Sequence, residues 1–197
     1  VGYGPGFGAI RINGTVLVDA PGGLKKHYDN NASFSSSKLI IPQHKNFQFG
    51  DDNFTIEAYI NPDNVSGTKA IVSTWNPGSN RRSYVLQLSN ASVLAATHPT
   101  GGNTSHPSMT GGTVTANAWS HVAFVRDGGT LRLFVNGTQV ATTTAGTVYS
   151  NTTDNLEIGA YPGSSANYFA GKIQDVRIYK GIAKYTSSFT PPGAILD

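Results

Sequence analysis

The stretch that decides the fold is Val122-Ala-Phe-Val-Arg126, Asp127-Gly-Gly-Thr130, Leu131-Arg-Leu-Phe-Val135 and Asn136-Gly137. Two alternating apolar and polar runs flank a short Gly-rich turn, and Asn-Gly follows the second run at once. Asn-Gly is the strongest short-range hairpin signal, because both central residues of a type I′ turn need positive φ. We therefore predict a meander of antiparallel strands in this part of the chain.

Outward from this stretch, the same kind of pattern recurs along the chain. In Phe54-Thr-Ile-Glu-Ala-Tyr-Ile60 the apolar residues share one face of a strand. Other strand-like runs are Lys69–Trp75, Ser83–Leu88, Ser92–Thr97, Leu156–Tyr161 and Phe169–Gly181. No window supports a helix of more than about two turns. The pattern predicts an all-β fold, a two-sheet antiparallel β-sandwich of the jelly-roll type with an extended N-terminal arm.

Two local irregularities qualify this prediction. Ile173 is out of phase with Val176 and Ile178, which predicts either a bulge or a strand buried on both faces. The segment from His98 to Gly112 shows no period and is rich in Gly, Pro, Ser and Thr, so we expect it to be the longest irregular loop.

The chain divides into an arm and a single domain. Residues 1–27 are rich in Gly and Pro around the apolar run Thr15-Val-Leu-Val18, which indicates an arm or linker carrying an edge strand. Residues 28–197 form the predicted sandwich. The first residues lack the pattern of a secretory leader, and no apolar run approaches the length of a membrane span, so neither feature is expected.

Composition restricts the classes of partner. Charged residues make up 13% of the chain, and the net charge of +3 comes from scattered Lys and Arg. A nucleic-acid interface needs a clustered basic stripe, so nucleic acid is not an expected partner. There is no cysteine, which excludes disulfides and thiolate metal sites and favours folding in a reducing cytosol.

Five motifs in order carry a family resemblance: Phe54–Ile60, Trp119–Arg126, Leu131–Gly137, Leu156–Gly159 and Gly171–Tyr179. Over residues 28–192 the chain resembles the laminin G-like, concanavalin A-like jelly-roll family. The ending Tyr179–Pro192 is similar to copies found in tailed-phage virion proteins. The resemblance implies a jelly roll and a place on a virion surface; this second step rests on analogy of fold.

Catalysis is not expected. Family relatives that hydrolyse glycosides need two carboxyls about 5 to 5.5 Å apart. The chain has two glutamates, Glu57 and Glu157, and neither predicted strand offers a second carboxylate on the same face. The two could still meet across strands, but partners such as Arg126, Arg177 or a backbone amide offer a structural explanation. Among five histidines, His121 is expected to be packed or hydrogen-bonded in a strand.

A calcium ion is the one cofactor that the resemblance suggests, because many laminin G-like domains bind calcium at the rim. The candidate ligands are Asp51, Asp52 and Asp154. Calcium takes six to eight oxygens, and the alternative is that Asp51 and Asp52 shape the turn before a strand. No other cofactor is expected.

Binding surfaces are better supported than catalysis. Sugar recognition uses flat aromatic faces and planar polar groups, and one predicted turn supplies both. The alternative is that Trp75 caps the core while the arginines contact a second subunit of a homo-oligomer. The candidate contact residues are Trp75, Asn76, Arg81, Arg82 and Tyr84 at that turn, Tyr161, Asn167 and Tyr168 in a second loop, and His98 and His106 beside the long loop.

These observations lead to two hypotheses. The first is a non-enzymatic virion structural module, a capsid-decoration or fibre protein that assembles in the host cytoplasm and contacts other virion proteins through the arm. The alternative is a carbohydrate-binding, lectin-like module of a phage adsorption protein or of a bacterial surface protein, with a host-surface glycan as its partner. A glycan hydrolase is disfavoured by the missing carboxylate pair.

Overall fold

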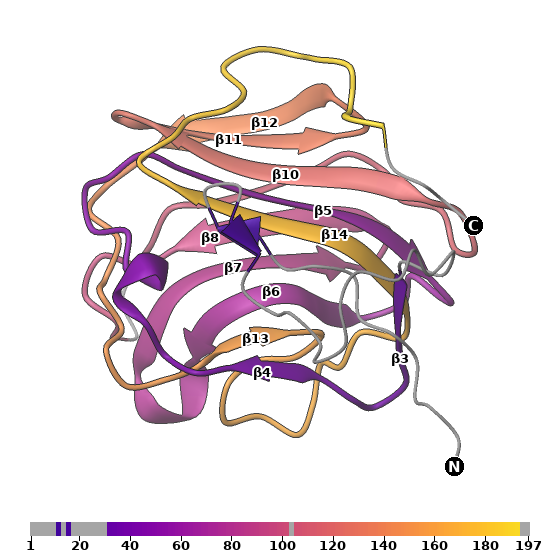
Figure 1. Ribbon diagram of the computed structural model, residues 1–197, viewed down its shortest axis with the longest axis horizontal. Coiled ribbons are helices and arrows are strands. Elements are labelled where there is room, and N and C mark those ends of the chain that lie inside the picture. Colours follow the sequence, from indigo (N-terminus) through magenta and orange to yellow (C-terminus); the bar gives the residue numbers. More distant parts are fainter. Residues whose placement is uncertain (1–10, 13–14, 17–30, 103–104, 194–197) are drawn as a thin grey trace.

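The computed structural model describes residues 11–12, 15–16, 31–102 and 105–193. Two β-sheets pack face to face (Figure 1), so the predicted all-β sandwich is confirmed. Sheet A has eight strands in the order β12-β11-β10-β5-β14-β1-β2, with β3 also on β14. Sheet B has six strands in the order β4-β13-β6-β7-β8-β9.

The strands of sheet A are β1 Arg11–Ile12, β2 Thr15–Val16, β3 Asn31–Phe34, β5 Phe54–Pro62, β10 Ser120–Asp127, β11 Thr130–Val135, β12 Thr138–Thr144 and β14 Gly171–Lys180. The strands of sheet B are β4 Leu39–Ile41, β6 Thr68–Asn76, β7 Arg81–Ser89, β8 Ser92–Thr97, β9 Ser108–Gly111 and β13 Leu156–Ile158. Two single 3₁₀ turns, η1 Lys45–Phe47 and η2 Pro77–Ser79, complete the described elements. Neither turn in the described part of the chain has the length or hydropathy needed to cross a bilayer.

The meander predicted around Asn136-Gly137 is confirmed. β10, β11 and β12 pair as consecutive antiparallel strands. The φ angles of Asn136 and Gly137 are +50° and +78°, as a type I′ turn requires. The bulge predicted near Ile173 is also present, because the pairing of β14 with β5 shifts register between Gln174 and Arg177.

Two details differ from the sequence prediction. The segment 98–112 is not all loop, because Ser108–Gly111 forms β9 and pairs with β8. The short β9 alternates exposed and buried side chains over only four residues, too few to show a period in the sequence. In addition, β1 pairs with β14 in parallel, while the other strand pairs described are antiparallel.

The N-terminal region contributes to sheet A. β1 and β2 extend the sheet beyond β14, so the edge strand predicted for the run 15–18 is confirmed at Thr15 and Val16, and residues 17–18 lie outside the described part. Most of the predicted arm, 1–27, lies outside the described residues, and its boundary stays a prediction.

Alternation along the strands divides each sheet into an inner and an outer face. Inner-face residues such as Ile56, Leu86 and Phe124 form the core between the sheets and are completely buried. The outer face of sheet A is crossed by residues 181–193, which we call the C-terminal strap. The Phe189 N–H of the strap donates a hydrogen bond of 2.8 Å to the Gly137 carbonyl, and Tyr185 and Phe189 pack on Phe134.

Candidate binding site

A row of side chains in register runs across the outer face of sheet B. Ala70 of β6 pairs with Gln87 of β7, Gln87 with Leu94 of β8, and Leu94 with Thr110 of β9. Ala70 is buried, Leu94 is half-buried and Thr110 is exposed. The outer face of sheet B therefore changes from covered over β6 to open at β9, and the four residues of this row are uncharged.

Trp75 lies at the centre of a small aromatic cluster on this face. Its ring centroid is 4.9 Å from that of His106 and 5.9 Å from that of His98, both in edge-to-face geometry. Tyr161 belongs to the same cluster and its hydroxyl donates to Gln87 Oε1. Trp75 and Tyr161 are each only 9% exposed. The cluster thus lies between the sheet and the loops above it, outside the main core that Trp75 was expected to cap, and leaves little open ring face for stacking.

One of these loops, residues 161–168, covers β6. The carbonyl of Asn167 accepts the Ala70 N–H at 3.0 Å. Gly163 lies so close to Asn76 that a Cβ atom there would approach its amide nitrogen to 3.0 Å. Asn167 and Tyr168 remain half-exposed at the end of the loop. The backbone of the loop is therefore held near Gly163 and at Asn167, while the side chains of Asn167 and Tyr168 remain accessible to solvent.

Asn76 and Arg81 join Asp154 in a polar network at the end of β6 and β7. Arg81 donates to both Asp154 oxygens at 2.8 Å, and Asn76 and Asn151 donate at 2.8 and 2.9 Å. Burial alone would raise the pKa of Asp154, but the hydrogen bonds from Arg81, Asn151 and Asn76 outweigh it and lower the pKa. The arginine that we expected to contact a ligand or a subunit therefore holds the loop of Asp154.

This network bears on the calcium prediction. Both oxygens of Asp154 already accept hydrogen bonds, while Asp51 accepts from Thr147 Oγ1 at 2.7 Å and Asp52 lies 3.4 Å from Lys180 Nζ. Within the described ranges, no group of three or more His, Asp or Glu side chains could hold a metal ion. The three candidate ligands do not form one site here, and calcium binding stays a prediction.

Arg82 ties together two loops beside Trp75, its register partner in the pairing of β6 with β7. Its guanidinium donates to the carbonyls of Gly102 at 2.7 Å and Pro77 at 3.1 Å, and to Asn80 Oδ1 at 2.9 Å. These three acceptors are neutral. They orient the guanidinium but do not neutralise its charge. The side chain is half-exposed.

Tyr84 does not belong to this site. It points into the core between the sheets, is completely buried, and packs on Phe49 with a centroid distance of 4.7 Å. Burial raises the pKa of its hydroxyl. The prediction that Tyr84 contacts a ligand is therefore wrong, because alternation along β7 places it on the inner face together with Leu86 and Leu88.

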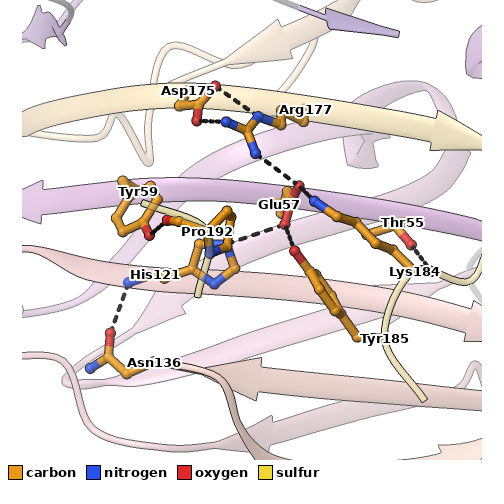
Figure 2. A network of polar contacts seen from close by, with 10 residues as sticks. All are labelled: Thr55, Glu57, Tyr59, His121, Asn136, Asp175, Arg177, Lys184, Tyr185 and Pro192. Carbon is orange, nitrogen blue, oxygen red and sulfur yellow. Dashed lines mark hydrogen bonds and ion pairs between the residues drawn. The ribbon is translucent and has the colours of Figure 1, made fainter. Parts of the chain in front are cut away.

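The outer face of sheet A carries a different kind of cluster (Figure 2). Glu57, 1% exposed, accepts hydrogen bonds from Lys184 Nζ at 2.6 Å and from the Tyr185 hydroxyl at 2.6 Å, and contacts His121 Nε2 at 3.2 Å. Arg177 Nη1 lies 3.7 Å away and its guanidinium is paired with Asp175. Two of the partners, Lys184 and Tyr185, come from the C-terminal strap. Glu57 is thus sealed by the chain itself.

The electrostatics of Glu57 agree with a structural role. Burial alone would raise its pKa, but hydrogen bonds from His121, Lys184 and Tyr185 outweigh burial and lower the pKa to about 2. A general acid in glycoside hydrolysis needs a raised pKa instead. Of the two arginines predicted as partners, Arg177 is present, whereas Arg126 turns to the carbonyls of Gly50, Asp52 and Gly128. His121 is hydrogen-bonded in its strand, as predicted.

The two glutamates cannot act as a catalytic pair. Glu57 lies between the core residues Ile56 and Ala58 in sheet A, so it points to the outer face of that sheet. Glu157 lies between the core residues Leu156 and Ile158 in sheet B, and it pairs with Lys38 at 2.8 Å. The sandwich core therefore separates the two carboxylates.

Sequence reasoning missed several residues of these clusters. Gln87 and Leu94 looked like ordinary strand residues, although alternation with Leu86 and Leu88 could have placed Gln87 on the outer face. Asn151 gave no signal, because its role depends on a contact with Asp154 and with the carbonyl of Arg81 across the fold.

Comparison with known protein families agrees with the observed jelly-roll sandwich. A profile described as the concanavalin A-like lectin/glucanases superfamily, of the laminin G type, matches residues 34–183, well over half of the chain. The chain belongs to this superfamily. A comparison of its sequence with curated proteins gave no match. The family part of the sequence resemblance is therefore confirmed.

Solved structures with the same fold include carbohydrate-binding proteins. The Ruminococcus gnavus IT-sialidase CBM40, bound to α2,3-sialyllactose, superposes with a TM-score of 0.57 at 21% identity, over 66% of this chain and 77% of that one. A candidate carbohydrate-binding protein from Bacteroides ovatus gives a TM-score of 0.62 at 22% identity, over 79% of this chain and 44% of that one. The leech intramolecular trans-sialidase gives 0.59 at 16%, over 79% and 27%. At these identities the likeness is one of fold.

Proposed function

We propose that this chain is a non-catalytic glycan-binding domain of a protein that acts outside the cell or on a surface. The observation that carries the proposal is the placement of the two glutamates on opposite outer faces of the sandwich. The superfamily holds lectins and glucanases, and the separation of Glu57 from Glu157 means that the two glutamates cannot serve as the carboxylate pair that a glucanase needs. Binding without hydrolysis is then the function that the fold supports best.

The binding surface that we propose is formed by the loops above sheet B around Trp75. Half-exposed polar and aromatic side chains gather on these loops, namely Arg82, His106, Asn167 and Tyr168. Each loop is fixed from below, by Trp75 or by the Asp154 network. A binding surface that is already ordered loses less conformational entropy when a ligand binds. The carbohydrate-binding neighbours of known structure support the same class of ligand.

The virion role stays a prediction. The similar structures described above are a sialidase CBM40, a candidate carbohydrate-binding protein and an intramolecular trans-sialidase, so they support the alternative hypothesis better than the virion hypothesis. A phage adsorption protein that binds a host-surface glycan would satisfy both. Docking through the arm and homo-oligomer formation have no observation in their favour among the described residues.

A glycan panel tests the proposal. The purified chain is incubated with immobilised neutral and sialylated oligosaccharides, including lactose and α2,3-sialyllactose, and with bacterial envelope polysaccharides, each with calcium and with a chelator. We expect saturable binding to at least one glycan without release of reducing ends. His106→Ala should weaken binding, whereas Lys45→Ala, an exposed residue at η1, should not. Turnover of a glycan, or no binding across the panel, would contradict the proposal.

A further inference from the structure

His98 follows β8 directly and is completely buried beside the proposed binding surface. Its Nδ1 accepts two backbone hydrogen bonds, from the Thr100 N–H at 3.2 Å and from the Gly101 N–H at 2.9 Å. The acceptor role assigns the tautomer of the neutral ring, because a nitrogen that accepts cannot carry a proton. His98 therefore holds the turn at Thr100 and Gly101 only while its ring is neutral.

The turn that His98 holds is coupled to the residues of the proposed site. The Gly101 carbonyl accepts the Arg82 N–H at 3.1 Å, and the Gly102 carbonyl accepts from Arg82 Nη1 at 2.7 Å. Gly101 has a φ of +78° and lies against the Tyr149 ring, which a Cβ atom would approach to 2.8 Å. Any displacement of Gly101 therefore moves two acceptors of Arg82, because one is the Gly101 carbonyl and the other belongs to the next residue.

His98 also contacts two aromatic rings of the proposed site. The His98 ring lies 5.3 Å from that of His106 and 5.9 Å from that of Trp75. Among the described residues, the titratable and charged groups that face this turn include His106, Tyr149, whose N–H donates to the His98 carbonyl, and Arg82 on β7. The Arg81–Asp154 ion pair lies on the same rim and its charges offset each other.

We propose that His98 is the positioning residue of the glycan site and that its protonation weakens glycan binding. This inference rests on the proposed glycan function. Protonation places an N–H at Nδ1, directly opposite two N–H donors, so both hydrogen bonds are lost and the charge is buried. The turn at Gly101 then releases Arg82 and the ring of His106 from their places beside Trp75. The consequence is a binding surface that is assembled at neutral pH and disassembled in acid.

The test compares the pH profiles of wild type and His98→Asn. The Asn Oδ1 can accept the same two N–H bonds but does not titrate. For the strongest binder of the panel, and with lactose and α2,3-sialyllactose as fixed probes, affinity is measured from pH 7.5 to pH 4.5. We expect a fall of tenfold or more in wild type and of less than twofold in His98→Asn, relative to its own value at pH 7.5. In glycan-free wild type, the amide resonances of Thr100 and Gly101 should titrate with the same midpoint.

Each other outcome is decisive. A flat wild-type profile with binding intact, or amide resonances of Thr100 and Gly101 that do not titrate, overturns the role of His98 and leaves the glycan function standing. An equal pH dependence in His98→Asn assigns the effect to another group, such as His106, and overturns the role as well. No binding to the whole panel at any pH overturns the glycan function, and the role of His98 with it.

Discussion

The outer faces of the two sheets are both covered, but by different means. On sheet A the C-terminal strap closes over Glu57 and saturates its carboxylate with hydrogen bonds from the same chain. On sheet B two loops rest on an aromatic cluster around Trp75 and present half-exposed side chains to solvent. A buried carboxylate with every partner supplied internally is a structural device, whereas ordered loops with outward polar groups can meet a ligand.

The largest change in stability is expected when the Glu57 cluster on sheet A loses its carboxylate. Glu57→Ala leaves Lys184, His121 and Tyr185 without their common acceptor. Removing one partner of a buried ionic cluster typically costs about 3 to 5 kcal/mol. We expect a decrease of that size in the free energy of unfolding, measured in urea. Glycan affinity at pH 7.5, measured well below the unfolding transition, should stay within twofold of wild type; a large loss would link Glu57 to binding.

On the other face, Trp75→Ala tests whether the aromatic cluster supports the loops. Replacing a buried Trp by Ala costs about 3 kcal/mol at the lower end of the usual range, and we expect that end because Trp75 lies under loops instead of between the sheets. Glycan affinity should fall at least tenfold in conditions where the variant is folded. Trp75→Phe keeps a ring against His106 and should retain more of both quantities. If Trp75→Ala binds like wild type, the loops do not depend on the cluster.

The next test measures how the free energy of unfolding changes in acid, where the Glu57 carboxylate becomes protonated. Its pKa is about 2 in the folded protein, below its ordinary value of 4.5. The ionised form therefore stabilises the fold above pH 4.5, and this contribution is lost as pH falls from 4.5 to 2. The loss amounts to roughly 3 kcal/mol. Unfolding curves of wild type and Glu57→Gln across this window should differ in slope; parallel curves would contradict the assignment.

The smallest expected effect concerns Lys38 and Glu157, at the β4 edge of sheet B. Lys38 is partly exposed, with 23% of its side chain accessible, whereas only 5% of the Glu157 side chain is accessible. Exposed pairs contribute about 0 to 1 kcal/mol. Because Glu157 is buried and Lys38 is not, Lys38→Met should lower the free energy of unfolding by about 1 kcal/mol, between the values for exposed and buried pairs; a loss of about 3 kcal/mol or more would show that this edge resembles the sealed cluster around Glu57.

The sequence predicts the fold well because its signals are local. Alternation in Phe54–Ile60, the Asn136-Gly137 turn and the phase change after Ile173 each depend on residues a few positions apart. The structure bears out all three. By contrast, β9 was assigned to a loop, because four residues that pair with β8 carry no period of their own.

The candidate site is predicted only in part. Trp75, His98, His106 and Tyr161 gather on the outer face of sheet B, but Tyr84 belongs to the core. The difference follows from the two-residue period of a strand, since Tyr84 shares the inner face with Leu86. Whether a side chain is exposed depends on loops that close from 70 or more residues away, as the Tyr161–Gln87 and Arg81–Asp154 contacts do. Such closures leave no pattern in a single sequence.

The central claim is that the outer face of sheet B binds glycan and that of sheet A does not. The most direct measurement places the same charge on each face, by Leu94→Lys on β8 and Ile182→Lys on the strap, and compares glycan affinity at pH 7.5. Leu94 is half-buried beside the aromatic cluster, and Ile182 is 45% exposed. The account predicts at least a tenfold loss of affinity for Leu94→Lys and less than a twofold change for Ile182→Lys. Equal affinities, or a loss confined to Ile182→Lys, would contradict it.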